Sequence, residues 1–394
     1  MSAAANPPLP PPEAETGAPV RYLPGDHDRE LRQGTALCLS GGGYRAMLFH
    51  VGVLWRLNQA GLLATLDRVS SVSGGSITAG VLAMNWNRLD LHDGVAQDFE
   101  AQLVAPVRKL AGVTIDITAV LSGLALPFVS ISDQVADDYA HHLFGHTTLQ
   151  DLPDQPRFIF NATNLESGVL MRFSKPYLAD YRVGRVNWPR LRLASAVAAS
   201  SAFPPFLSPC TIDLRGSDWQ TEPGNDLTGD EFRGEIRLSD GGVYDNLGLE
   251  TAWKLYSGIL VSDAGGRFKP EPDPPGDWPR HTLRVLQVVD SQVRALRKRQ
   301  VIDAFEAGVR GGMYIGIRSD PSEYPASPGI PSDPKVTQQL AATPTRLDAM
   351  DAALQERLIN WGYAICDSGL RSYVLPDAAP GRLPYPAHPL DRTT

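Results

Sequence analysis

The sequence predicts an α/β fold built around a parallel sheet. A short apolar stretch at residues 36–40 leads through a glycine-rich turn into a helical pattern at residues 44–60. The same order recurs when residues 68–72 lead through a small-residue turn into a helical pattern at residues 74–88. Alternation of strand, tight turn and helix is typical of parallel sheets covered by helices. Hydrophobic residues make up 43% of the chain and charged residues 20%, which supports a sizeable core and argues against global disorder.

The later elements follow from local pattern. Residues 98–145 are mostly helical in pattern and form an insertion between core elements. Polar residues at 215–234 and several prolines at 319–334 predict loops. The other expected elements are a strand pair at 157–161 and 169–173, a small-residue helix at 191–200, strands at 235–238, 258–262 and 312–317, and helices at 282–308 and 346–364.

The chain divides into a leader, one large domain and a tail. Residues 1–33 contain a proline run and predict a disordered leader without the features of an export signal. Residues 34–375 form the domain, which includes the helical insertion at about 98–150 and the C-terminal helices, and residues 376–394 predict an irregular tail. Three widely spaced cysteines without a CxxC pair favour a reducing, cytoplasmic setting.

Charge and hydropathy restrict the classes of partner that the chain can have. The chain has 36 Lys and Arg against 44 Asp and Glu, a net charge of −8 that disfavours a general nucleic-acid binder. A local basic cluster lies at residues 294–299. The uncharged stretch 117–132 is shorter than the roughly 20 residues that a membrane span needs. It predicts a buried helix or acyl-pocket wall, or alternatively a segment that docks on a membrane surface.

A serine lies at the turn between the second strand and its helix. Ser73 is flanked by Ser71 on one side and by Gly74 and Gly75 on the other, which approximates the G-x-S-x-G nucleophile elbow with Ser71 in place of the first glycine. Small residues are needed there because the turn is strained and its neighbours come close together. The alternative is a helix start in which Ser73 is an ordinary N-cap.

The first turn has two competing interpretations. Gly41, Gly43 and Ala46 fit the G-x-G-x-x-A form of the dinucleotide fingerprint, but the acidic residue expected at the end of the second strand is missing. The alternative is an oxyanion loop, in which the N–H groups of Gly41, Gly42 and Gly43 face a developing negative charge. Arg45 adds positive charge at this turn, or else forms an ordinary ion pair.

A general base is the next requirement. Asp240 follows a predicted strand and precedes two glycines, so its carboxylate could accept the hydroxyl proton of Ser73. A local turn role is the alternative, and Asp263, followed by Ala-Gly-Gly, is a second candidate base. Neither His281 nor His388 follows a predicted strand, and no histidine pair has metal-ligand spacing. A Ser–Asp dyad without metal or cofactor is the economical interpretation.

The motifs, taken in order, resemble those of the patatin-like phospholipase family. The resemblance covers about residues 34–265 and is carried by the glycine turn 41–45, the serine turn 71–76, the small-residue run 198–206 and the Asp-Gly-Gly at 240–242. It implies a three-layer α/β/α fold with a mainly parallel central sheet, and lipid acyl hydrolysis through a Ser–Asp dyad. By motif, Ser73 is the nucleophile, Asp240 its base, and Gly41–Gly43 the oxyanion loop assisted by Arg45. Ser71, and Ala46 where the family often has glycine, depart from the pattern.

The expected protein is a phospholipase A-type hydrolase of membrane glycerophospholipids that needs no cofactor. Because its substrate lies in a bilayer, we expect a cytoplasmic protein with transient, peripheral membrane contact. The stretch 117–132 and the basic cluster at 294–299 are the expected contacts. The alternatives are a catalytically silent lipid-binding protein on the same fold and a nucleotide-dependent oxidoreductase. Head group, acyl position and oligomeric state are left open.

Overall fold

The computed structural model describes residues 31–115, 131–205, 207–326 and 328–392. Most of the expected leader and almost all of the expected docking stretch 117–132 therefore lie outside the described residues. Within the described parts, no helix combines the length and the apolar character needed to cross a membrane.

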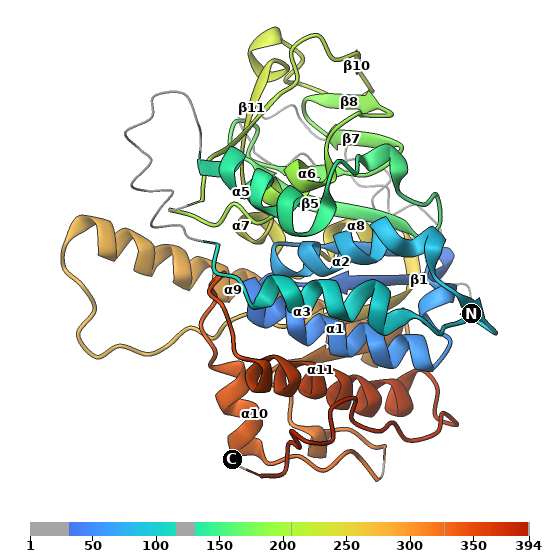
Figure 1. Ribbon diagram of the computed structural model, residues 1–394. Helices are drawn as coiled ribbons and strands as arrows, with labels where there is room; N and C mark the ends of the chain where they lie inside the picture. The colour runs from blue at the N-terminus through green and yellow to red at the C-terminus, as the bar shows by residue number, and fades with distance from the viewer. Residues whose placement is uncertain (1–30, 116–130, 206, 327, 393–394) are drawn as a thin grey trace, which may run out of the picture.

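Five parallel strands form the centre of the sheet (Figure 1). Their order is β13-β12-β1-β2-β5, and each neighbouring pair is parallel. The strands are β1 (Arg32–Leu39), β2 (Arg68–Ser71), β5 (Arg157–Asn164), β12 (Tyr256–Asp263) and β13 (Gly311–Gly316). The strand–turn–helix repeats predicted from the sequence supply β1 and β2 of this parallel set.

Antiparallel strands extend the sheet beyond β5. The chain continues through β6 (Leu170–Phe173), β7 (Tyr177–Asp180), β8 (Gly184–Asn187) and β10 (Trp219–Gln220), each antiparallel to the last. A further strand, β11 (Glu235–Asp240), pairs with both β5 and β9 (Cys210–Asp213). The central sheet is thus mixed. Strands β7, β8, β9 and β10 were not predicted, and β10 lies within the expected loop 215–234, because two- to four-residue strands carry too little periodicity.

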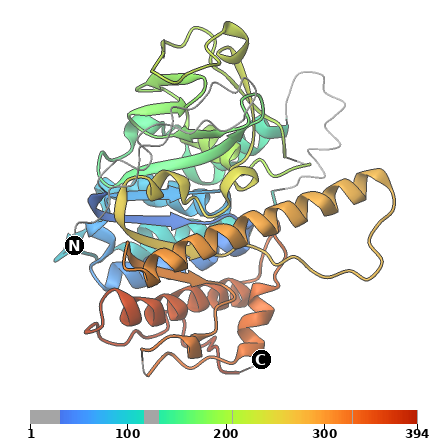
Figure 2. The same ribbon diagram turned by 180° about the vertical axis from the view of Figure 1, so that it is seen from behind.

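Helices cover both faces of the parallel strands, as the α/β/α prediction requires (Figures 1 and 2). In β1, Leu37 and Leu39 join the core cluster that contains α1 (Gly43–Gln59), α2 (Gly74–Asn85) and α11 (Ala352–Tyr373). Ala36 and Cys38 point to the other cluster, which includes residues of α8 (Glu250–Trp253) and α9 (Trp278–Glu306). Alternation along one strand therefore serves two helical layers, and the predicted fold class is confirmed.

The insertion and the late helices differ from the predicted boundaries. The described part of the insertion contains a π-helical turn at Glu100–Val104, α3 (Ala105–Ala111), α5 (Ile131–Tyr139) and a second π-helical turn at Ala140–Phe144. Helix α11 begins after Asp351, whose side chain accepts a hydrogen bond from Leu354 N, and not at residue 346. Helix α9 likewise begins after the N-cap Asp277. The other helices are α6 (Leu193–Ser200), α7 (Gly242–Asp245) and α10 (Pro334–Ala341).

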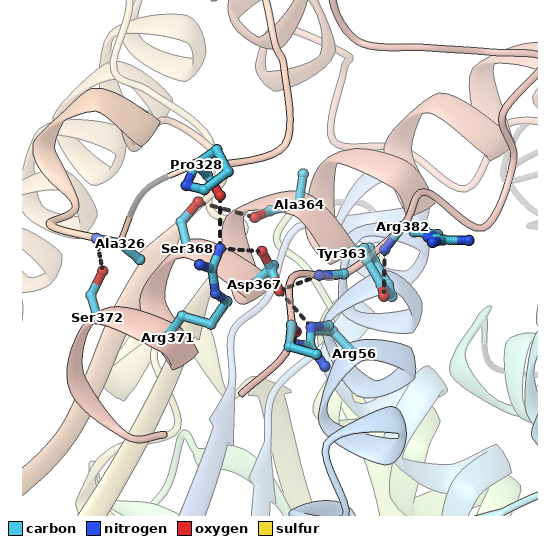
Figure 3. Close-up of polar contacts among 12 residues, drawn as sticks. Arg56, Ala326, Pro328, Tyr363, Ala364, Asp367, Ser368, Arg371, Ser372 and Arg382 are labelled. Atoms are coloured by element: carbon cyan, nitrogen blue, oxygen red, sulfur yellow. Dashed lines mark hydrogen bonds and ion pairs between the residues drawn. The ribbon is translucent and has the colours of Figure 1, made fainter. Parts of the chain in front are cut away.

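A buried ionic cluster ties the C-terminal segment to the helical layer (Figure 3). Asp367 of α11 accepts hydrogen bonds from Arg56 Nε of α1 at 2.7 Å and from Gly381 N at 3.0 Å. Its second oxygen lies 3.5 Å from Arg371 Nη1. Arg56 also donates to Ala379 O at 2.8 Å. Residues 376–392 contain no helix or strand, and this cluster helps to fasten them in place.

Candidate active site

Ser73 occupies a strained turn between β2 and α2. Its φ is 52° and its ψ −121°, a conformation that costs a non-glycine residue free energy and is found at functional sites. The backbone N–H of Ser73 donates to Ser200 at the tip of α6, at 3.2 Å to O and 3.1 Å to Oγ. Its hydroxyl makes no capping hydrogen bond to α2, although Ser73 holds the N-cap position. A nucleophile elbow presents its serine in a strained strand-to-helix turn of this kind.

The neighbours of Ser73 explain the small residues of this turn. A Cβ on Gly74 would lie 2.2 Å from Gly43 O, and one on Gly75 would lie 2.5 Å from Leu39 O. Ser71 is buried, and its hydroxyl donates to Ile159 O at 3.2 Å and accepts from Ser76 Oγ at 3.0 Å. A serine therefore fits where the elbow pattern has glycine, because its hydroxyl is fully used inside the protein.

The glycine turn lies directly against the serine turn. A Cβ on Gly41 would approach Ser73 Cβ to 3.1 Å, and Gly42 and Gly43 have φ values of 145° and 61°. Among the described residues, neither Gly42 N–H nor Gly43 N–H donates a hydrogen bond, whereas Gly41 N–H donates to Asn246 O at 3.1 Å. Together with the start of α1, this loop can stabilise an anion.

Arg45 fastens this loop from within the protein. The side chain is buried, with Nη2 donating to Ala264 O at 2.9 Å and Nη1 to Thr343 O at 2.6 Å. Burial, reinforced by Arg318 and Arg294, lowers the pKa of Arg45 to about 10, so it stays charged at neutral pH. The arginine joins the start of α1 to the segment after β12 and leaves a fixed positive charge behind the glycines.

Strand pairing brings Asp240 to the serine turn. Along β5, Ser71 of β2 lies opposite Phe160, and Asp240 of β11 lies opposite Ala162. Strand β6 pairs with Phe160 and Ala162 along the other edge of β5. Strands β2 and β11 therefore lie along the same edge of β5, one after the other. Residues distant in sequence thus meet because β5 is long enough to pair with two strands end to end.

The Asp240 carboxyl group is buried and only half satisfied. Oδ1 accepts a hydrogen bond from Gly242 N at 2.7 Å, whereas Oδ2 is buried without a hydrogen-bond partner among the described residues. Burial raises the pKa of Asp240 to about 7, and the Gly242 amide and the Ser73 hydroxyl partly offset that rise. Ser73 therefore lies close enough to influence this carboxyl group, although the described hydrogen bonds include none between the two side chains. A group with such a pKa can take up and release a proton near neutrality.

The second candidate base has other contacts. Asp263 lies at the end of β12, where Oδ2 accepts from Tyr314 Oη at 2.6 Å and Oδ1 accepts from Gly265 N at 2.8 Å. Both oxygens are thus occupied by neighbours outside the serine turn. Asp240, in contrast, has one oxygen without a hydrogen-bond partner in the described part of the chain, and the Ser73 hydroxyl contributes to its pKa.

Two histidines have partners away from the serine turn. His50 is buried between Ser40 O at 2.9 Å and Ser262 Oγ at 2.8 Å, and burial lowers its pKa to about 4, so it is neutral. His388 lies 3.3 Å from Glu356. Within the described ranges, no histidine hydrogen-bonds to Ser73 or Asp240, and no group of three or more His, Cys, Asp or Glu side chains has the arrangement of a metal site.

Two supporting side chains were not singled out from the sequence. Ser200 Oγ donates to Asn161 O at 2.7 Å and contacts Ser76 Oγ at 2.8 Å, while Asn161 Nδ2 donates to Ser71 O at 2.9 Å. These bonds tie α6 and β5 to the serine turn. Ser200 falls in the small-residue run 198–206, which was the available signal, whereas nothing local marks Asn161.

Comparison with solved structures gives distant likenesses. Human GIVD cytosolic phospholipase A2 in complex with methyl gamma-linolenyl fluorophosphonate is 14% identical, with a TM-score of 0.48, over 86% of this chain and 58% of that chain. VipD from Legionella pneumophila is 15% identical, with a TM-score of 0.35, over 85% of this chain and 66% of that chain. The protein thus spans less than two thirds of the length of either chain. No curated protein matches the sequence.

The sequence itself gives the family. The profile of the patatin-like phospholipase family matches residues 37–253, a range that begins in β1 and contains the glycine turn, Ser73 and Asp240. Because this match extends over more than half of the sequence, the chain belongs to the patatin-like phospholipase family.

Proposed function

We propose that the protein is a lipid acyl hydrolase of the phospholipase A type, which cleaves fatty-acyl esters of membrane glycerophospholipids through Ser73 and Asp240. Family membership supports lipid acyl hydrolysis in general. The observation that carries the finer proposal is the serine in a strained turn beside a buried carboxyl group whose pKa is raised to about 7.

The reaction divides into two steps. In the first, Asp240 accepts the hydroxyl proton as Ser73 Oγ bonds to the acyl carbonyl carbon, and the N–H groups of Gly42 and Gly43 stabilise the oxyanion. Collapse breaks the ester bond, and the lysolipid alkoxide leaves with the proton held by Asp240. In the second, Asp240 takes a proton from water, the hydroxide attacks the acyl-enzyme, and the fatty acid departs as Ser73 regains its proton.

Burial gives Asp240 the properties that this role requires. An exposed aspartate with a pKa near 3.9 would be a weak base for a serine hydroxyl, whereas a pKa near the working pH balances ionised fraction against basicity. The unpartnered Oδ2 leaves one oxygen free to accept the proton. The fixed charge of Arg45 behind the glycine turn adds to the stabilisation of the oxyanion. No metal or organic cofactor enters these steps.

A bilayer substrate implies contact with a membrane surface. We propose that the protein acts from the cytoplasmic side and associates with the membrane transiently, as a peripheral protein. The elbow admits little solvent, since Ser73 is only 8% exposed, so a single lipid chain must leave the bilayer to reach it.

The test combines covalent labelling with a lipid panel. A fluorophosphonate probe should label Ser73, and Ser73→Ala should lose both labelling and hydrolysis of phospholipids and of a soluble short-chain ester, a loss of several powers of ten. Ser71→Gly is the matched control, because it restores the usual elbow residue and should keep labelling and turnover.

Three outcomes would contradict the proposal. Labelling at Ser71 or Ser76 would show that Ser73 is not the nucleophile. Lipid binding by the wild type without turnover of any ester would indicate a silent lipid-binding protein. Purified protein that retains NAD(P) would favour a nucleotide-dependent oxidoreductase.

A further inference from the structure

Helix α9 carries apolar side chains on its solvent face. Trp278, Val289 and Leu296 are 81%, 53% and 59% exposed, and Val285 and Leu286 are also exposed. Positions 278, 285, 289 and 296 are seven, four and seven residues apart, so they share one side of the helix. A surface helix of a globular protein usually has the opposite arrangement, with its apolar stripe toward the core. We call these four positions the α9 stripe.

The other side of α9 faces the protein near its C-terminal half. Val301 is buried there, Arg297 forms an ion pair with Glu250 at 2.8 Å, and Arg294 donates to Gly266 O. Figures 1 and 2 both show that the N-terminal half of α9 projects beyond the rest of the molecule, together with the loop that precedes it. The stripe thus lies on a projecting element, where a flat surface can reach it.

The charge of this region contrasts with that of the chain. Residues 267–299 contain eight Arg and Lys and four Asp and Glu, which is a net charge of +4, whereas the whole chain carries −8. Arg280 and Arg299 have exposed side chains on α9. An exposed apolar stripe on a helix with flanking basic residues is typical of helices that lie in the interface of an anionic membrane.

The projecting element is joined to the candidate active site. Arg294 of α9 donates a hydrogen bond to Gly266 O. Two residues earlier in the same segment, Ala264 O accepts a hydrogen bond from Arg45 at the glycine turn. Helix α7, which directly follows Asp240 and Gly241, contacts α9. A membrane surface in contact with α9 would therefore lie on the same side of the protein as the elements that carry the proposed catalytic groups.

We propose that the N-terminal part of α9 docks on membranes that contain anionic phospholipid, with the α9 stripe inserted among the acyl chains and the basic residues at the head groups. This proposal rests on the proposed function, in which the substrate is a membrane lipid. A membrane fits better than pairing of α9 with the α9 of a second copy, because two equally basic helices repel each other, whereas anionic head groups attract them.

The test measures binding apart from turnover. Full-length Ser73→Ala protein is sedimented with vesicles of phosphatidylcholine, with and without phosphatidylserine. The triple change Trp278→Ser, Val285→Ser and Val289→Ser should weaken binding by about tenfold or more. Leu165→Ser with Val309→Ser is the matched control, since both side chains are exposed and lie outside the stripe, and it should leave binding unchanged.

A charge variant separates the two contributions. Arg280→Gln with Arg299→Gln should reduce binding to vesicles that contain phosphatidylserine, remove part of its salt dependence, and leave the weaker binding to pure phosphatidylcholine unchanged. Loss of binding to both vesicle types in equal measure would overturn the head-group role of these arginines.

Turnover keeps this proposal distinct from the proposed function. With Ser73 restored, the triple variant should hydrolyse a soluble short-chain ester at the wild-type rate and lose vesicle hydrolysis, which also shows that it is folded. Unchanged vesicle binding by the triple variant would overturn the docking proposal. A concentration-dependent dimer of the wild type that the triple change abolishes would assign the stripe to a second copy. If stripe-dependent binding persists while the wild type cleaves no ester, docking stands and the proposed function fails.

Discussion

Two buried aspartates in this protein have opposite surroundings. Asp367 of α11 lies between Arg56 and Arg371 and also accepts a hydrogen bond from Gly381 N. Asp240 of β11 is 2% exposed and accepts a hydrogen bond from Gly242 N. Each aspartate has one oxygen without a hydrogen-bond partner among the described residues, but that oxygen of Asp367 lies 3.5 Å from Arg371 Nη1. Among the described contacts, two cations reach Asp367, and no ion pair involves Asp240.

The surroundings of a buried aspartate separate a structural role from a chemical one. Burial of a charge is costly unless a counter-charge compensates it. At Asp367 the arginines supply that compensation, and the same cluster of contacts fastens the C-terminal segment (Figure 3). At Asp240 compensation is incomplete and the pKa rises to about 7, so the group is poised to exchange a proton.

The largest expected effect is on turnover when Asp240 changes. Asp240→Asn keeps the shape of the side chain but removes the proton acceptor, so kcat on phospholipid and on a soluble ester should fall by about a thousandfold or more. Steady-state kinetics and circular dichroism check the rate and the fold together. His281→Ala and His388→Ala are the controls and should stay active. A histidine variant as inactive as Asp240→Asn would replace the dyad by a triad.

A smaller effect, on stability, is expected at Asp367. Asp367→Asn leaves Arg56 and Arg371 buried without their counter-charge, which should cost about 3–5 kcal/mol of unfolding free energy. Denaturant titration measures the loss, while kcat per folded molecule should stay at the wild-type value. Glu222→Gln, which breaks the exposed ion pair with Arg185 at 3.0 Å, is the control and should change stability little. If Asp367→Asn lost turnover without losing stability, the structural role assigned to Asp367 would be wrong.

The subtlest expected effect is on pH dependence. If Asp240 must be ionised to act, kcat/KM should rise as pH increases through about 7 and level off above it. The raised pKa also means that the folded state binds this proton more tightly than the unfolded chain does. Ionising Asp240 therefore costs stability as pH rises from about 4, its unfolded value, through about 7.

The stability of Asp240→Asn tests whether ionisation of Asp240 destabilises the folded state. Because asparagine does not ionise, the melting temperature of the variant relative to wild type should be higher at pH 8 than at pH 5. Asp367→Asn should melt below wild type at both values. A melting difference for Asp240→Asn that does not vary with pH, or that falls as pH rises, would contradict the raised pKa.

The sequence alone determined the features that local chemistry controls. The glycine turn and the serine turn each join a strand to the helix that follows it directly in the sequence. The glycines of these turns have no room for a larger side chain, so the local sequence specifies the path of the chain there. The α/β class followed from the same alternation, and β1, β2, α1 and α2 were predicted closely for that reason. The short strands β7, β8, β9 and β10 were missed because their few residues lack a period.

The reason for proposing Asp240 and not Asp263 as the base comes from the tertiary structure. Asp240 and Asp263 have nearly the same local pattern, and the choice depends on β11 pairing with β5 beside the end of β2, a contact that no local pattern encodes. The raised pKa of Asp240 likewise comes from burial, which is a property of the packed molecule. The sequence predicted a helix over residues 282–308. Which side of that helix faces the core was decided by packing, because periodicity defines a face but not its neighbour.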